Sequence, residues 1–145
     1  MKSLRVAVLL WTTGVIVVTG FALAAEPSLV LPDKLLWTSP RPGVQVAWVV
    51  GADKTPGPYL LRVKLAPGAE IPPHTHPDER NSTVLSGTIY VGFGENAEES
   101  KIIAIPTGGV YVAPANVAHY VWAKGGEATY QESGVGPTAT IPIER

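Results

Sequence analysis

The three histidines of this 145-residue chain are its clearest candidates for chemistry. His74 and His76 stand two positions apart in the segment GAEIPPHTHPDERNSTVLSG, residues 68–87, directly after a double proline. Residues i and i+2 of an extended strand face the same way, so the two neutral imidazoles could grip one metal ion together. A pair of exposed loop histidines is the alternative, because the residues that follow are polar surface types.

The residues around the histidines resemble the two signature motifs of the cupin superfamily. The first motif, G-x5-H-x-H-x3–4-E-x6-G, is matched at Gly68, His74, His76 and Gly87. The second motif, G-x5-P-x-G-x2-H-x3-N, is matched at Gly108, Pro114 and His119. The resemblance covers about residues 40–135 and implies one divalent transition metal ion held by all three histidines. Imidazole ligands suit Zn, Mn, Fe, Ni or Cu, and the sequence does not choose among them.

The chain departs from the first motif at its glutamate position, which holds Arg80, while Glu79 comes one residue early. Arginine stays protonated and offers only donors, so it cannot be a metal ligand. A shift of one residue turns a side chain to the opposite face of a regular strand. Three alternatives follow: Glu79 reaches the ion through a looped HPDER segment, water completes a three-histidine site, or Arg80 projects into the pocket and holds an anionic group of the substrate.

The second motif also contains two departures. Asn116 stands where the family has a glycine, and Ala123 stands where it has an asparagine. Asparagine tolerates left-handed backbone geometry, so Asn116 is expected to fit the turn at little cost.

Short strands must position these residues, because Gly and Pro interrupt β-branched and aromatic segments throughout the chain, with 15 Gly and 14 Pro in total. The pattern predicts strands at 44–50, 59–67, 101–105, 109–113, 119–123 and 128–132, and two more within 83–94 that turn at Ser86-Gly87. An all-β sandwich or barrel follows, and the resemblance implies a cupin-type jelly-roll β-barrel with the ion in its mouth. The expected divisions are an N-terminal arm at 25–39, a cupin domain at 40–135 and an extended tail at 136–145 that packs along an edge.

Alternation within the predicted strands assigns further side chains to the inside or the outside. His119 and Val121 should face the interior, so Tyr120 and Trp122 should face away from the ion. Gln131 is a candidate to point inward near the ion. Catalytic residues other than the ligands remain unknown, apart from Arg80 as a contact to the substrate.

The chain begins with Lys2 and Arg5, continues with an apolar run and reaches the small-residue pattern Ala22-Leu23-Ala24. This arrangement predicts a secretory signal peptide at residues 1–24 and a periplasmic or secreted protein. An uncleaved membrane anchor is the alternative, because the apolar run is about long enough to span a bilayer.

Composition excludes several classes of function. The chain has no cysteine, which excludes disulfides, thiolate metal sites and cysteine nucleophiles. Without Lys2 and Arg5, 9 of the 11 basic residues remain against 12 acidic ones. No basic run or aromatic-basic stripe accompanies this acidic balance, so nucleic acid is not an expected partner.

The resemblance implies three classes of function. The first is an exported metal-dependent enzyme, a dioxygenase, decarboxylase or isomerase, acting on a small carboxylate or oxygenated organic molecule. The second is a non-catalytic sensor of metal or ligand, since the chain also resembles ChrR-like cupin modules. The third is a structural jelly roll. The expected partner is a small-molecule ligand, the resemblance implies a homodimer through sheet edges, and any membrane contact would come only through an uncleaved N-terminal segment.

Overall fold

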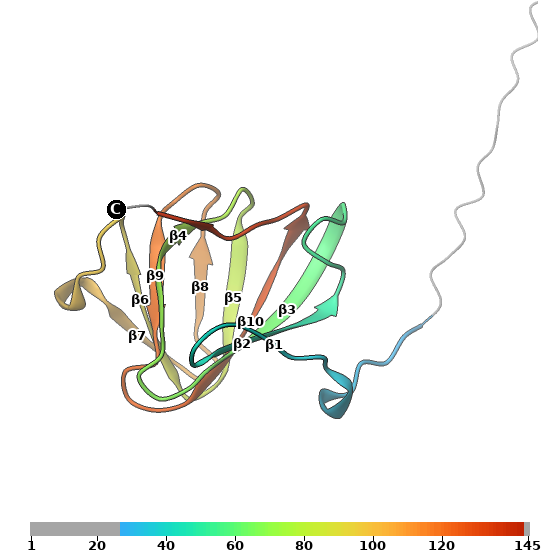
Figure 1. Cartoon of the computed structure of the whole chain (residues 1–145), viewed down its shortest axis with the longest axis horizontal. Helices are drawn as coiled ribbons and strands as arrows, with labels where there is room; N and C mark the ends of the chain where they lie inside the picture. The colour runs from blue at the N-terminus through green and yellow to red at the C-terminus, as the bar shows by residue number, and fades with distance from the viewer. Residues whose placement is uncertain (1–26, 144–145) are drawn as a thin grey trace, which may run out of the picture.

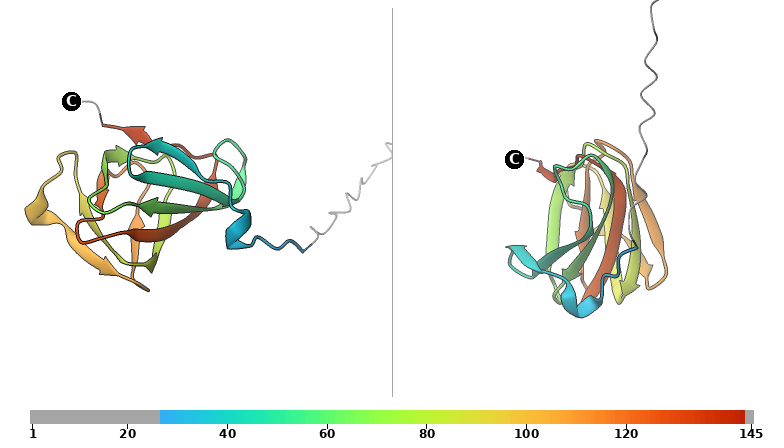
Figure 2. Two further views of the ribbon diagram at one scale, coloured as in Figure 1. Left: turned by 60° about the horizontal axis from the view of Figure 1, so that its bottom comes forward. Right: turned by 90° about the vertical axis from the view of Figure 1, so that its right-hand side faces the viewer.

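The computed structural model describes residues 27–143, which fold into two antiparallel sheets that face each other (Figure 1, Figure 2). The first sheet has the strand order β1-β2-β3-β10-β5-β8, and the second has the order β11-β4-β9-β6-β7. The strands are β1 (Thr38–Arg41), β2 (Val44–Val50), β3 (Gly57–Leu65), β4 (Glu70–Thr75), β5 (Arg80–Ser86), β6 (Thr88–Phe93), β7 (Ile103–Pro106), β8 (Val110–Ala113), β9 (His119–Trp122), β10 (Ala128–Gly136) and β11 (Ile141–Pro142). This architecture confirms the predicted all-β jelly roll.

The strands whose ranges were predicted from the sequence are present, β4 is the extended segment expected to carry His74, and the two short strands β1 and β11 join at sheet edges. β1 and β11 escape prediction because each is short and contains proline. β11 pairs with β4 at the edge of the second sheet, which confirms that the tail is extended and packs along an edge. In Figure 1 this C-terminal segment, drawn in red, crosses from the end of β10 in one sheet to β4 in the other.

The core lies between the two sheets, where alternate side chains of each strand meet. Along β3, Leu61, Val63 and Leu65 are buried and the residues between them are not, as the period of two predicts. Val91 of β6 and Val121 of β9 face them from the second sheet. Each of these side chains contributes about 1.5–3 kcal/mol through burial, so the apolar faces hold the two sheets together.

Gly87 forms the connection through which the chain passes from the first sheet to the second, between β5 and β6. Its φ is +73°, in the left-handed region that favours glycine. A Cβ at this position would overlap the carbonyl oxygen of Glu127 and lie 3.0 Å from the Cα of Ala128. Both backbone conformation and close approach therefore explain the glycine that closes the first motif.

The predicted N-terminal arm contains the 3-10 helix η1 (Pro32–Lys34) and the start of β1, and a second such turn, η2 (Glu99–Lys101), precedes β7. Among the described residues, the structure holds no helix with the length and apolarity that a bilayer span requires. The predicted signal peptide at residues 1–24 lies outside the described residues.

Candidate functional site

A bulge in β4 turns the first two histidines toward the interior. Ile71 pairs with Val121, but the next pairing joins His74 to His119, so β4 contains one residue more than β9 between the two pairs. The extra residue falls at Pro72 and Pro73, which lack the N–H groups that a regular ladder would use. Since one extra residue reverses the alternation, the bulge moves His74 and His76 onto the inner face that Ile71 occupies before it.

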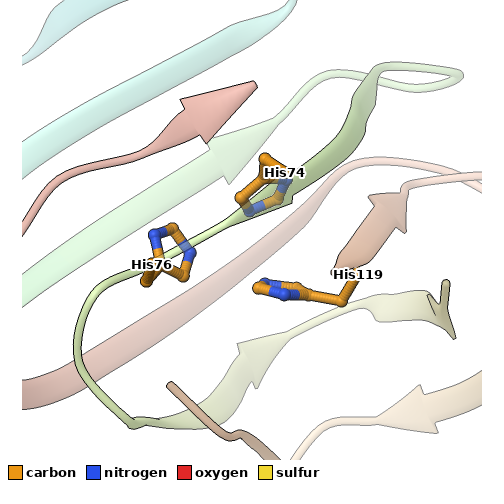
Figure 3. A group of neighbouring side chains, drawn as sticks. All are labelled: His74, His76 and His119. Atoms are coloured by element: carbon orange, nitrogen blue, oxygen red, sulfur yellow. The ribbon is translucent and has the colours of Figure 1, made fainter. Parts of the chain in front are cut away.

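The three histidines meet inside the barrel. His74 is the direct partner of His119 across the β4–β9 ladder, and opposite residues of an antiparallel pair share one face. His76 follows at the end of β4, and the three rings converge in Figure 3. One nitrogen from each ring lies within 4.8 Å of the others, and all three side chains are buried. The three histidines are therefore positioned to bind one metal ion.

Backbone carbonyls hold the three rings in place by their Nδ1 atoms. The carbonyl oxygens of Pro72 and Ala139 lie 2.7 Å from Nδ1 of His74 and His76, respectively, and that of Val117 lies 3.2 Å from Nδ1 of His119. A carbonyl can only accept, so each Nδ1 donates and each Nε2 keeps its lone pair. The Nε2 atoms of His76 and His119 are buried with no hydrogen-bond partner among the described residues.

This donor set fits a metal ion. Metal-bound imidazoles characteristically donate their second N–H to a carbonyl or carboxylate, which fixes both tautomer and ring direction. A buried nitrogen without a partner otherwise costs free energy, which a metal–nitrogen bond would recover.

The left-handed turn before β9 joins the two motifs. Asn116 has φ 60° and is the one non-glycine residue with positive φ within 27–143, so it adopts the left-handed geometry that the sequence predicts for this turn. Its N–H donates to the carbonyl oxygen of His76 at 2.7 Å. The turn therefore ties the loop after His76 to the strand that carries His119.

Glu79 and Arg80, the two residues at or next to the glutamate position of the first motif, lie in different surroundings. Residues 76–79 form a loop between β4 and β5, yet Glu79 is exposed and does not belong to the histidine group. Arg80 begins β5 and is buried inside the barrel. Of the three alternatives, this placement argues against ligation by Glu79.

The Arg80 guanidinium is held by neighbours on several sides. Its Nη1 donates to Glu132 Oε2 at 2.7 Å, and its Nη2 donates to Thr138 Oγ1 at 2.7 Å. Asp78 Oδ1 lies 3.9 Å from Nε, and Asp78 also accepts hydrogen bonds from Thr138 and, at 2.5 Å, from Tyr59. Burial raises the pKa of Glu132, and the charge of Arg80 opposes that rise. Arg80 thus anchors a buried polar network next to the histidines.

Glu132 and Thr138, two members of this network, were not predicted from the sequence. Glu132 faces inward from β10, whereas Gln131 accepts a hydrogen bond from Arg62 on the other face, so the inward placement of Gln131 was wrong. The inward direction of Glu132 could have been predicted, because Glu132 stands two positions after the buried Tyr130 and residues i and i+2 of a strand share a face. No local pattern marks Thr138, because its partners lie far away in the sequence.

The outward assignment of β9 side chains agrees with the structure. Tyr120 O–H donates to the carbonyl oxygen of Glu98 and accepts from the N–H of the same residue, both at 2.9 Å. Tyr120 and Trp122 border a hollow beside η2 instead of the cavity at the histidines.

A cavity of about 550 Å³ opens beside the histidine group. Its walls include His74, His76, Arg80 and Glu132, together with Thr138 of the C-terminal segment. A larger groove of about 710 Å³ lies along residues 39–45, 64–66 and 127, but it contains no histidine. Of these two, the smaller cavity therefore combines metal-binding side chains with space for a small molecule.

Burial keeps the histidines neutral. The pKa of His74 is lowered to about 4, mainly by burial and to a smaller extent by the charge of His119. The pKa of His76 is lowered to about 3, mainly by burial and to a smaller extent by the charge of Arg80. Burial also lowers the pKa of His119. Neutral imidazoles are the form that binds metal, so the fold presents ligands ready for an ion.

The metal-free protein should lose stability in mild acid. Unfolded histidines titrate near pH 6.5, so as the pH falls below 6.5 the unfolded chain takes up protons that folded His74 and His76 refuse until about pH 4. Each pH unit across this window should remove about 1.4 kcal/mol of unfolding free energy per histidine, and above pH 6.5 the effect vanishes. Urea titrations between pH 7 and 5 with a chelator measure it. A constant midpoint would contradict the prediction, and His74→Ala/His76→Ala should show a flatter profile.

Thr138 should stabilise the domain through its hydroxyl. Thr138→Val keeps the shape but removes the hydrogen bonds to Arg80 and Asp78, leaving buried charges less satisfied. The free energy of unfolding should fall by about 1–3 kcal/mol. Chemical denaturation measures the loss. Thr140→Val is the control, since Thr140 is exposed and should change stability by less than about 0.5 kcal/mol; equal effects at both positions would refute the role of the hydroxyl.

Comparison with known proteins adds a family and a set of structural relatives. The family model described as Cupin domain matches residues 61–130. Germin-like protein 5-1 of Oryza sativa subsp. japonica is 34% identical over 76 residues, which cover 50% of this chain and 33% of that protein. The chain thus spans about a third of the length of such curated relatives.

Solved structures share the architecture at lower identity. The structure of KdgF from Halomonas sp. has a TM-score of 0.62 at 21% identity and covers 77% of this chain and 96% of that one. The polyketide cyclase RemF from Streptomyces resistomycificus has a TM-score of 0.70 at 14% identity, covering 83% of this chain and 87% of that one. At these identities the likeness concerns the fold alone.

Proposed function

Because the chain belongs to the cupin superfamily, we propose that it is a metal-dependent enzyme acting on a small carboxylate or oxygenated organic molecule. His74, His76 and His119 would hold one divalent transition metal ion. The observation that carries this proposal is the convergence of three buried imidazoles beside a cavity of about 550 Å³. Two of these imidazoles have buried Nε2 atoms with no partner in the part of the chain that the structure describes.

Three protein ligands favour an open site over a sealed one. Structural zinc sites usually have four protein ligands, whereas catalytic sites have three and leave a position for water or substrate. A bound ion would supply Lewis acidity at that position. The protein's own part is to keep the imidazoles neutral and aimed, through their carbonyl partners and their burial. Arg80 lies on the cavity wall with Nη1 held by Glu132 and Nη2 held by Thr138, so we propose that it acts on the substrate through Glu132 and not as a direct contact for an anionic group.

Elemental mass spectrometry of the purified chain, made without a histidine tag, tests the metal site. We expect about one equivalent of a transition metal in the parent and none in His74→Ala/His119→Ala. The identity of the metal then directs the search for a substrate. If the parent neither contains nor takes up a metal, the proposal fails. A tightly held metal whose removal unfolds the protein, with no ligand bound, would instead favour a structural role.

Export is proposed from the sequence of residues 1–24. Expression of the full chain in a bacterium should yield periplasmic protein whose intact mass corresponds to a chain beginning at Ala25. A full-length mass in the membrane fraction would instead identify an uncleaved anchor.

A further inference from the structure

We propose that Glu132 determines the specificity of the cavity by accepting a hydrogen bond from a hydroxyl group of the ligand, with Arg80 as the residue that positions it. The site would thereby select a molecule with a hydroxyl next to its metal-binding oxygen over the same molecule without it. This inference rests on the proposed function, since it assumes that the ligand lies beside the histidine group.

Glu132 is the buried carboxylate on the wall of this cavity. It lies on the same inner face of β10 as the buried Tyr130, which stands two positions earlier, and is 4% exposed. The cavity also contacts Asp53, which is exposed at its rim, and no other acidic side chain among the described residues. A ligand in this cavity therefore meets one buried carboxylate.

Arg80 is largely committed to this carboxylate and its neighbours. The ion pair with Glu132 engages Nη1, and Thr138 engages Nη2. The ion pair uses Oε2 of Glu132, which leaves Oε1 outside it. With Asp78 also at 3.9 Å, the positive charge of Arg80 faces two carboxylates. A carboxylate of the ligand at this wall would meet negative charge, whereas a hydroxyl would donate into it.

Two buried hydroxyls lie in line with Glu132 on the inner face of the first sheet. Ser82 pairs with Glu132 across the β5–β10 ladder and with Tyr111 across the β5–β8 ladder, so the three form one row on the inner face. Ser82 Oγ and Tyr111 O–H are buried and make no hydrogen bond of regular geometry within residues 27–143, but Ser82 lies close enough to Glu132 and Tyr111 to act against the rise that burial causes in the pKa of both. The ring of Tyr111 lies 6.3 Å from that of His119, centroid to centroid. The row thus leads from Glu132 back toward the histidine group, and Glu132 is the member of the row that lines the cavity and that a ligand would meet.

Glycolate and acetate test the inference, because they differ only by the hydroxyl. The probe is the zinc-loaded full-length protein, and calorimetry measures both affinities. The parent should prefer glycolate, and Glu132→Gln should reduce that preference by about tenfold or more, the range expected for a hydrogen bond to a charged group. Zinc affinity should stay the same in the variant, because Glu132 does not belong to the ligand group.

Three controls keep the result decisive. Glu127→Gln removes an exposed carboxylate outside this cavity and should leave the preference unchanged. If Glu132→Gln does not fold, Arg80→Gln/Glu132→Gln removes both charges together and should show the same loss. A preference that stays within threefold of the parent in Glu132→Gln, or in the double variant where the single one does not fold, would overturn the inference. Failure of the parent to bind zinc would overturn the proposed function itself, which the zinc titration reveals before any ligand is added.

Discussion

His119→Ala is expected to lower the zinc affinity of the protein by more than 100-fold while the domain stays folded. The change removes one of three convergent nitrogens and leaves the apolar core between the sheets intact. Loss of a group that merely orients a ligand weakens metal binding 10- to 100-fold, so loss of a ligand should exceed that range. Competition with a chromophoric chelator measures the affinity, and circular dichroism checks the fold.

Val121→Ala is the matched control for this prediction. Val121 lies on the same strand and the same inner face, and it is as well buried as His119. Its truncation should destabilise the protein by loss of packing but leave zinc affinity within a few-fold of the parent. If His119→Ala binds zinc as tightly as the parent does, the three-histidine site is wrong.

Arg80→Ala is expected to lower the free energy of unfolding by about 3–5 kcal/mol, because it leaves the buried carboxylate of Glu132 without its partner. Arg80→Met/Glu132→Leu removes both charges and should recover most of this loss, since an apolar pair of similar size avoids the desolvation of two ions. Denaturant unfolding of Arg80→Met, Glu132→Leu and the double variant Arg80→Met/Glu132→Leu forms a cycle that measures the coupling between the side chains.

The exposed pair of Lys124 and Glu99 provides the comparison. These side chains also form an ion pair, but 43% and 60% of their surfaces are exposed. Lys124→Ala should change stability by less than about 1 kcal/mol, because solvent screens such pairs. A loss below 1 kcal/mol for Arg80→Ala as well would show that Arg80 is not needed for the fold, and would make a role in ligand binding its main one.

The sequence by itself determined the features that depend on local spacing. Alternation along β3 and β9 is a property of any extended chain, so the inward faces of Leu61 and His119 could be predicted without a structure. Positive φ at Gly87 and Asn116 follows from the residue types that tolerate it. The motif spacing likewise identified all three histidines that the fold brings together.

Only the tertiary structure decided which groups surround the histidines. The Nδ1 partner of His76 is the carbonyl of Ala139, 63 positions away, and Arg80 meets Glu132 across 52 positions. A bulge at Pro72 and Pro73 sets the face of β4, whereas simple alternation from Ile71 would place His74 outside. Such contacts depend on strand order and register across two sheets, which are set by how the faces pack and not by any short stretch of residues.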